Sequence, residues 1–156
     1  MKKVFSILLI TITICFVGCA RIKFLFTEQD VFYAEQQKSI TLAENFCFAL
    51  SDDDIEIAEG YLHPDSPLCD GNLVSFLSTI EQENGIDFSR GVTFRDRELI
   101  EAYANTSNDP ADHQGYTFIF YLEVVIDGKI TKLSFEMVYN EKGCGVYSFE
   151  KYIPKG

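Results

Sequence analysis

The sequence predicts an α+β domain in which N-terminal helices pack on a strongly curved antiparallel sheet of about four strands. Residues 31–50 carry apolar side chains at helical spacing. Residues 115–139 instead alternate between two faces on either side of an Asp-Gly pair, which is typical of a β-hairpin. Helices that precede consecutive strands along the chain indicate the α+β class.

Three helices are expected before the sheet. The apolar face of the first is formed by Ile40, Ala43, Phe46, Cys47 and Leu50. A short second helix is expected behind a cap at Asp52 or Asp53. The third is expected to begin behind a cap at Asp70 or Asn72 and to end at Asn84-Gly85, where the glycine suits the left-handed conformation after a helix. The chain then turns into strands.

The sheet is expected to begin with residues 92–103, as one long strand or as two short strands with an irregularity near Asp96. Asp127-Gly128 favours a two-residue type I′ turn. Pairing about this turn produces one apolar face, with Phe120 opposite Phe135, and a second face with Glu123 opposite Lys132. A three-residue loop at residues 142–144 would complete the sheet by setting Tyr139 opposite Tyr147 and Met137 opposite Phe149.

The first 18 residues are typical of a secretory signal that is removed from the mature protein. Lys2 and Lys3 precede an apolar run over residues 4–17, which ends in Gly18-Cys19. This end resembles a bacterial lipobox, which implies that Cys19 is lipidated and becomes the mature N-terminus. The expected organisation is a signal peptide (1–18), a lipidated tether (19–30) and a single α+β domain (31–156), anchored to a membrane of the bacterial cell envelope.

Three alternatives remain for this segment. These interpretations are an ordinary signal peptide without a lipid, an uncleaved membrane anchor and a buried strand. Its apolar run is short for a membrane span, and Arg21 and Lys23 behind it oppose that orientation under the positive-inside rule.

The chain of 156 residues has a formal net charge of −11. Removal of residues 1–18 takes away Lys2 and Lys3 and no acid, so the mature charge is −13. Such a domain is a poor binder of nucleic acid and of anionic lipid headgroups. The acidity serves solubility, or it attracts a basic protein partner.

Three cysteines follow Cys19. Cys47 lies on the apolar face of the first helix and is expected to be an inert core residue. Cys69 and Cys144 are expected in loops, where they are a candidate disulfide pair in an oxidising compartment. None of the cysteines has metal-ligand spacing to another cysteine or to a histidine.

One pattern resembles a known family, and it is formed by Phe46, Ala49, Leu50, Asp53, Ala58, Tyr61, Leu62 and Pro64. It resembles the opening of the ketosteroid-isomerase/nuclear-transport-factor-like superfamily, and most of all the small bacterial lipoproteins with this domain. The resemblance implies a cone-shaped, cystatin-like fold whose sheet wraps around a long first helix. It also implies an apolar pocket, used for catalysis in some members and for binding or dimerisation in others.

No catalytic residue can be assigned, because no local motif of this chain matches the catalytic groups of that superfamily. The candidate binding residues are Tyr61, His63, Tyr103 and Tyr121. His63, which precedes a proline, is more often a surface or capping residue than a base, and tyrosines in strands are mostly packing residues. The sequence contains no phosphate-binding loop, nucleophile elbow or zinc motif, so no metal and no cofactor is predicted.

Three functions remain open. The first is a non-catalytic, membrane-tethered module that binds a small apolar ligand or a protein partner. The second is an acidic interaction or inhibitor protein that captures a basic partner. The third is a small pocket enzyme of the isomerase or hydrolase type, which requires an acid and a hydrogen-bond donor to converge in one concave pocket.

Overall fold

A computed structural model of the chain describes residues 32–105 and 115–153. The chain divides into two compact units, Met1–Gln36 and Gln37–Gly156, and residues 32–36 of the first unit are helical. The predictions for the signal peptide, for Cys19 and for the tether lie outside the described residues.

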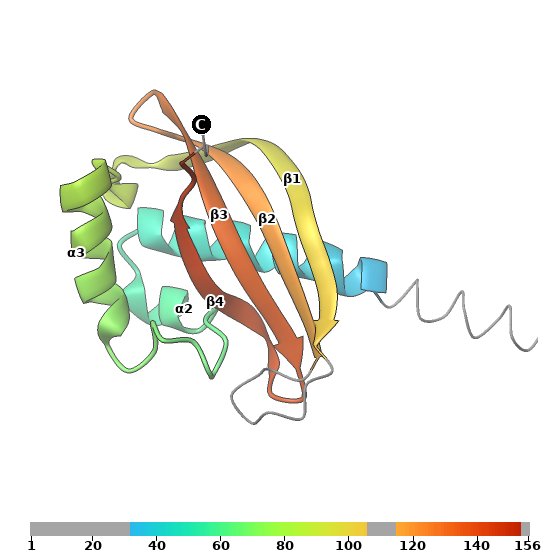
Figure 1. Cartoon of the computed structure of the whole chain (residues 1–156). Helices are drawn as coiled ribbons and strands as arrows, with labels where there is room; N and C mark the ends of the chain where they lie inside the picture. Colours follow the sequence, from blue (N-terminus) through green and yellow to red (C-terminus); the bar gives the residue numbers. More distant parts are fainter. Residues whose placement is uncertain (1–31, 106–114, 154–156) are drawn as a thin grey trace, which may run out of the picture. The chain divides into compact units, whose positions relative to one another are not determined.

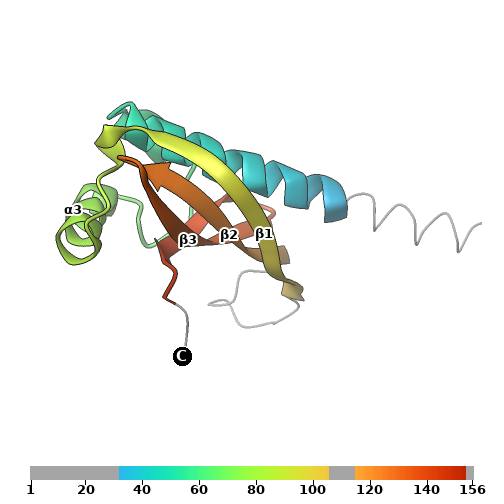
Figure 2. The same cartoon turned by 90° about the horizontal axis from the view of Figure 1, so that it is seen from above.

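The second unit is α+β, as predicted. It begins with a first helix at residues 37–51, followed by α2 (Ile55–Glu59), α3 (Asn72–Asn84) and a 3₁₀ turn (Phe88–Arg90). Four strands follow, β1 (Val92–Asn105), β2 (Gly115–Ile126), β3 (Lys129–Asn140) and β4 (Gly143–Lys151), and they form one antiparallel sheet in chain order (Figure 1). Figure 2 shows that this sheet is curved and that the first helix lies along one of its faces.

The caps of the short helices differ from the prediction. Asp53 has a left-handed backbone conformation (φ 59°), so the chain turns there and Asp54 becomes the cap of α2. The Asp54 carboxylate accepts a hydrogen bond of 3.1 Å from the Ile57 N–H. At α3 the cap is Gly71, which offers no side-chain hydrogen bond, whereas the predicted end at Gly85 is confirmed (φ 65°).

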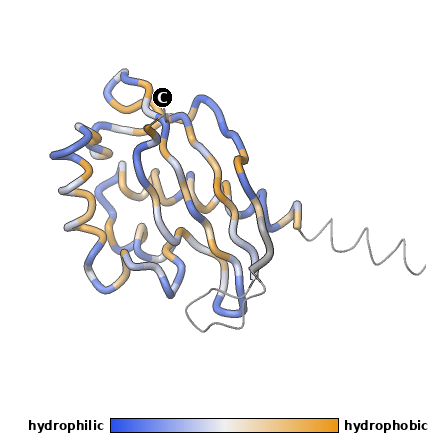
Figure 3. Tube along the Cα trace, viewed as in Figure 1, coloured by the Kyte–Doolittle hydropathy of each residue, from blue (hydrophilic) through white to orange (hydrophobic). Residues whose placement is uncertain are grey.

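The central hairpin has the predicted register. Asp127 (φ 51°) and Gly128 (φ 73°) both have positive φ, as a type I′ turn requires. Phe120 lies opposite Phe135, and Glu123 lies opposite Lys132. Hydropathy alternates along the strands (Figure 3), so that apolar side chains share the face that the first helix covers.

The register of the last hairpin was predicted wrongly. The turn consists of two residues, so Tyr139 lies opposite Cys144 and not opposite Tyr147. A bulge next to Glu136 then shifts the pairing by one residue, which sets Phe149 opposite Phe135. The irregularity predicted near Asp96 is confirmed as a register shift in β1.

Aromatic rings fill the space between the first helix and the sheet. Phe46 of the helix meets Phe149 edge-on at a ring-centroid distance of 5.2 Å, and Phe149 stacks on Phe135 at 5.4 Å. Several large side chains of this core are completely buried: Phe46, Phe118, Phe120, Leu122, Leu133, Phe135 and Met137. Each contributes roughly 1.5–3 kcal/mol through burial, so this face of the sheet is the hydrophobic core.

Candidate functional site

The face of the sheet that points away from the first helix is called the open face here. Its central positions on β2 are Ile119, Tyr121 and Glu123, which alternate with the core residues. Strand pairing arranges the open face in three rows across the sheet: Asp96–Glu123–Lys132, Glu98–Tyr121–Ser134–Glu150 and Glu101–Ile119–Glu136–Ser148. Every row therefore carries two carboxylates.

Lys132 is the single cation in these rows. Its ammonium group lies 3.1 Å from a carboxylate oxygen of Glu98 and 4.4 Å from the ring centre of Tyr121. The hydrogen bond with Glu98 raises the pKa of Lys132, so Lys132 keeps its charge at neutral pH. Burial, followed by a hydrogen bond with Tyr152, raises the pKa of the Tyr121 phenol, which stays protonated. Lys132 thus neutralises one of six carboxylates.

The other five carboxylates have no ion-pair partner within residues 32–105 and 115–153: Asp96, Glu101, Glu123, Glu136 and Glu150. The open face also carries large apolar and aromatic groups, because Ile130 is 55% exposed and the ring of Tyr121 lies against that of Tyr152 at 4.3 Å. An acidic surface with exposed apolar groups can bind a surface of opposite charge.

A hollow of about 650 Å³ lies where the open face meets the edge of β4, and is called the β4-edge hollow here. Its lining comes from the segment before α3, from α3 and from the sheet: Pro67, Leu68, Asn72, Phe76, Ile119, Ser134, Glu136, Ser148, Phe149 and Glu150. The walls are mainly apolar, and the two carboxylates belong to the acidic rows of the open face.

Glu136 is held in place inside this hollow. The Ser148 hydroxyl donates a hydrogen bond of 3.0 Å to Glu136 Oε2, and both side chains are partly buried. An acid and a hydroxyl within hydrogen-bond distance satisfy part of the geometry that the enzyme hypothesis requires. The only other ionisable group among the lining residues is Glu150.

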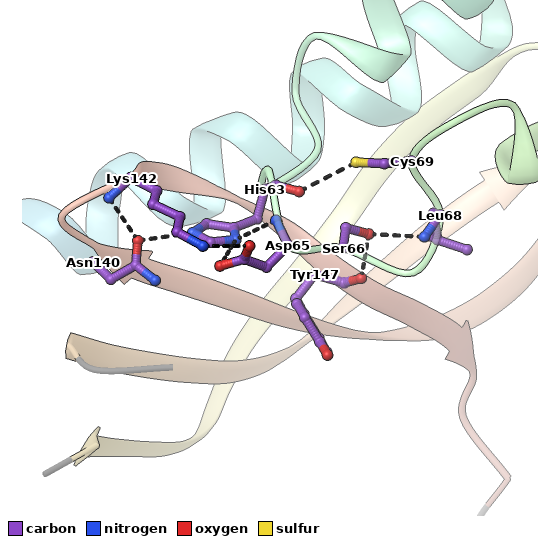
Figure 4. A network of polar contacts seen from close by, with 8 residues as sticks. All are labelled: His63, Asp65, Ser66, Leu68, Cys69, Asn140, Lys142 and Tyr147. Carbon is purple, nitrogen blue, oxygen red and sulfur yellow. Dashed lines mark hydrogen bonds and ion pairs between the residues drawn. The ribbon is translucent and has the colours of Figure 1, made fainter. Parts of the chain in front are cut away.

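The segment that leads into one wall of the hollow contains a buried histidine, His63, and a serine, Ser66, that is bonded to Tyr147 of β4 (Figure 4). The prediction for His63 was a surface or a capping position. The side chain has no exposed surface, so the surface position was wrong, whereas its Nδ1 caps the following turn by accepting a hydrogen bond from the Asp65 N–H at 3.1 Å. Nε2 must therefore carry the proton, which it donates to Asn140 Oδ1 at 3.0 Å. The same Asn140 oxygen accepts from the Lys142 N–H.

Backbone contacts explain why His63 is buried. Its N–H donates to the Val146 carbonyl, and the Val146 N–H donates to the Tyr61 carbonyl, so this segment lies against β4 as a short parallel bridge. The Ser66 hydroxyl donates to the Tyr147 carbonyl at 2.6 Å and accepts from the Leu68 N–H. These bonds position the beginning of the hollow's wall.

The four predicted binding residues do not form one site. His63 is part of the buried network, and Tyr61 is half-buried beside it. Tyr121 lies on the open face. The backbone of Tyr103 pairs with Thr117 near the end of β1. Of the four, Tyr121 lies within the three acidic rows, and the carboxylates of these rows were not predicted as a group from the sequence.

The cysteines of the second unit are present as thiols. Cys47 is completely buried in the core, as expected. Cys69 Sγ donates to the His63 carbonyl at 3.4 Å, and Cys144 Sγ lies 3.4 Å from Ser39 Oγ. The disulfide between Cys69 and Cys144 stays a prediction for the oxidised protein. Within the described residues no group of three or more His, Cys, Asp or Glu side chains could hold a metal ion.

A second hollow, of about 640 Å³, lies between the end of α3 and the β2–β3 turn. Arg90, Lys129, Lys132 and Lys151 contribute to its lining. Arg90 is bound by Asp87 and Asp127. The last turn of α3 contains no basic residue, and its carbonyl groups carry partial negative charge. Lys132 already binds Glu98, and Lys129 and Lys151 line the hollow beside this helix end, where positive charge is favourable.

Comparisons with protein-family models, with curated proteins and with solved structures found no match for this chain. None of the helices in the described part of the chain has the length and apolar character needed to cross a membrane.

Proposed function

We propose that this chain is a lipid-anchored protein of the bacterial cell envelope whose domain binds a basic protein partner on its open face. The observation that carries the proposal is the charge of this face, with six carboxylates and one ammonium group in three rows. Complementary charge steers two proteins together and disfavours wrong partners. The exposed apolar groups beside the carboxylates supply area that the partner can cover.

A protein partner is favoured over a small apolar ligand inside the domain. The family resemblance implied an apolar pocket between the first helix and the sheet. In this chain, however, Phe46, Phe120 and Phe135 occupy that region with no exposed surface. The resemblance to the ketosteroid-isomerase/nuclear-transport-factor-like lipoproteins stays a prediction about ancestry and fold, and the binding surface is proposed on the opposite face.

The anchor and the binding face are tested separately. Replacement of Cys19 by serine removes the thiol that the lipobox would lipidate. We expect the wild-type chain from its host to carry the added mass of a diacylglycerol, and the Cys19→Ser chain to lack it, as intact mass spectrometry would reveal. A wild-type chain without lipid would refute the lipid anchor and would not contradict the proposed binding face.

The binding face is tested by photo-crosslinking in the host. A photoreactive amino acid at Ser134, on the open face, is expected to crosslink a polypeptide with a basic segment. The matched control carries it at Ile57 on α2, which is 53% exposed and outside these rows. Exchange of Glu101 and Glu123 for glutamine should reduce the crosslink, and so should 0.5 M salt, since screening shortens exposed electrostatic interactions to less than about 10 Å.

Three results would contradict this proposal: equal crosslinking from Ile57, an acidic crosslinked segment, or a yield that neither salt nor the glutamine variants change. Any of them would refute a basic partner on this face.

A further inference from the structure

We propose that the β4-edge hollow binds one long cationic side chain, arginine or lysine, of the basic partner. This inference rests on the proposed function and adds to it a single residue of the partner, whose side chain is buried in the hollow. A few anchors in well-packed pockets usually carry most of the binding energy of an interface, and arginine is enriched among them.

The walls of the hollow suit the aliphatic part of such a side chain. Leu68 and Phe76 line it on the side of the helices, and Ile119 lines it on the open face. Arginine and lysine cover apolar surface with their methylene groups while the charged end reaches a polar environment. A volume of about 650 Å³ is within the range of pockets that hold small ligands, and it exceeds what one side chain needs.

The two carboxylates of the hollow suit the charged end. Glu136 is partly buried, and Ser148 holds its Oε2, while Oε1 makes no hydrogen bond within the described residues. Glu150 lies on the adjacent row and is exposed. A partly buried carboxylate without a cation is costly, because desolvation is not offset by an opposite charge. An incoming guanidinium or ammonium group supplies that charge.

A neutral alternative is less favoured by these residues. An apolar side chain of the partner would fill the hollow but would further desolvate Glu136 without neutralising it. Arginine can donate two parallel hydrogen bonds to one carboxylate, whereas lysine acts as a point charge, so the geometry of Glu136 can distinguish them.

The test uses small probes and the full chain in neutral detergent micelles, followed by nuclear magnetic resonance of the backbone amides. n-Butylguanidinium and n-butylammonium represent the two cationic side chains, and n-butylurea is the neutral isostere. We expect saturable shifts of the Ser148 and Phe76 amides with the cations, and binding weaker by about tenfold or more with the urea, since hydrogen bonds between charged groups are the strong ones.

Glu136→Gln is the decisive variant, because glutamine keeps an oxygen for the Ser148 hydroxyl and removes only the charge. It should weaken n-butylguanidinium binding by about tenfold, whereas Glu141→Gln, at an exposed position of the β3–β4 turn outside the acidic rows, should leave it within about twofold. Equal binding of the urea, shifts spread over the whole face, or an unchanged affinity of Glu136→Gln would each overturn the inference. If crosslinking from Ser134 succeeds and these probes fail, binding of a cationic side chain in the β4-edge hollow is refuted and the proposed function stands.

Discussion

His63 illustrates how burial changes the meaning of a residue. In the sequence it precedes a proline in a polar loop, which is typical of a surface histidine. In the structure its imidazole is completely buried and joins the Asp65 N–H to the Asn140 side chain, 77 positions further along the chain. A neutral imidazole has one donor and one acceptor, and both are used here.

We expect His63→Ala to lower the free energy of unfolding by about 2–4 kcal/mol, because it leaves a cavity and removes two hydrogen bonds. Chemical denaturation measures this loss. Glu141→Ala, at an exposed position of the β3–β4 turn, is the control and should stay within about 0.5 kcal/mol of the wild type. Equal stabilities of the two variants would refute a structural role of the histidine.

The three thiols are expected to differ in reactivity. Burial, and to a lesser degree the charge of Glu44, raises the pKa of Cys47 far above its usual range. Burial first, and then the charges of Asp70 and Glu59, raise that of Cys69. A thiol reagent should therefore modify half-buried Cys69 and Cys144 in the folded protein and reach Cys47 only after unfolding.

The same experiment tests the predicted disulfide. If the bridge forms, protein taken from its native compartment without reductant would show no reaction of Cys69 and Cys144 with the thiol reagent. Its mass would also be lower by two hydrogen atoms than that of the reduced protein. Rapid modification of both cysteines in that sample would refute the bridge, and modification of Cys47 in the folded protein would contradict the packing of the core.

Among the elements, the short bridge between residues 61–63 and β4 requires a glycine. A Cβ atom at Gly145 would lie 2.5 Å from His63 N and 2.7 Å from the Leu62 carbonyl carbon. Both atoms belong to the backbone, so neither can move aside by a rotamer change. The bridge in turn positions Ser66 and the wall of the β4-edge hollow.

Gly145→Ala should therefore separate this segment from β4 and cost about 1–3 kcal/mol of stability, as overpacking typically does. Hydrogen exchange should accelerate at the amides of His63 and Val146, which form the bridge. Gly60→Ala is the control, because its φ of −64° suits alanine and its Cβ would come no closer to the backbone than 3.2 Å, at the Ile57 carbonyl oxygen. It should change stability by less than about 1 kcal/mol. Unchanged exchange in Gly145→Ala would contradict the close approach.

For the whole molecule, the charge of the open face opposes association of two copies through it. Such a pairing would bring the acidic rows of both copies together, and Lys132 already binds Glu98. We expect the full chain in neutral detergent to be monomeric at about 10 mM salt, where the Debye length is about 30 Å, as sedimentation would measure. A stable dimer whose two copies crosslink to each other through a photoreactive amino acid at Ser134 would contradict a repulsive open face.

Prediction from the sequence succeeded where local chemistry decides the structure. Asp127-Gly128 favours one turn type, and the alternation on both sides then permits one register for the core face. It failed at β4, where the choice between a two-residue and a three-residue turn and the bulge beside Glu136 depend on how Phe149 packs against Phe46 and Phe135. The caps of α2 and α3 failed for a related reason, because the left-handed turns at Asp53 and Asp70 precede them.

Part of the acidic surface could be predicted from the sequence, because Glu123 and Glu136 already belonged to the predicted outer face of the hairpin. The carboxylates of β1 and β4 could not be predicted as part of it, since their positions depend on two register shifts in β1 and one in β4. The sequence by itself therefore determined the α+β class, the central hairpin and the overall acidity, through local turn preference, side-chain period and charge count. Only the tertiary structure decided which carboxylates share a face and that His63 is buried, because both depend on contacts between segments far apart in the chain.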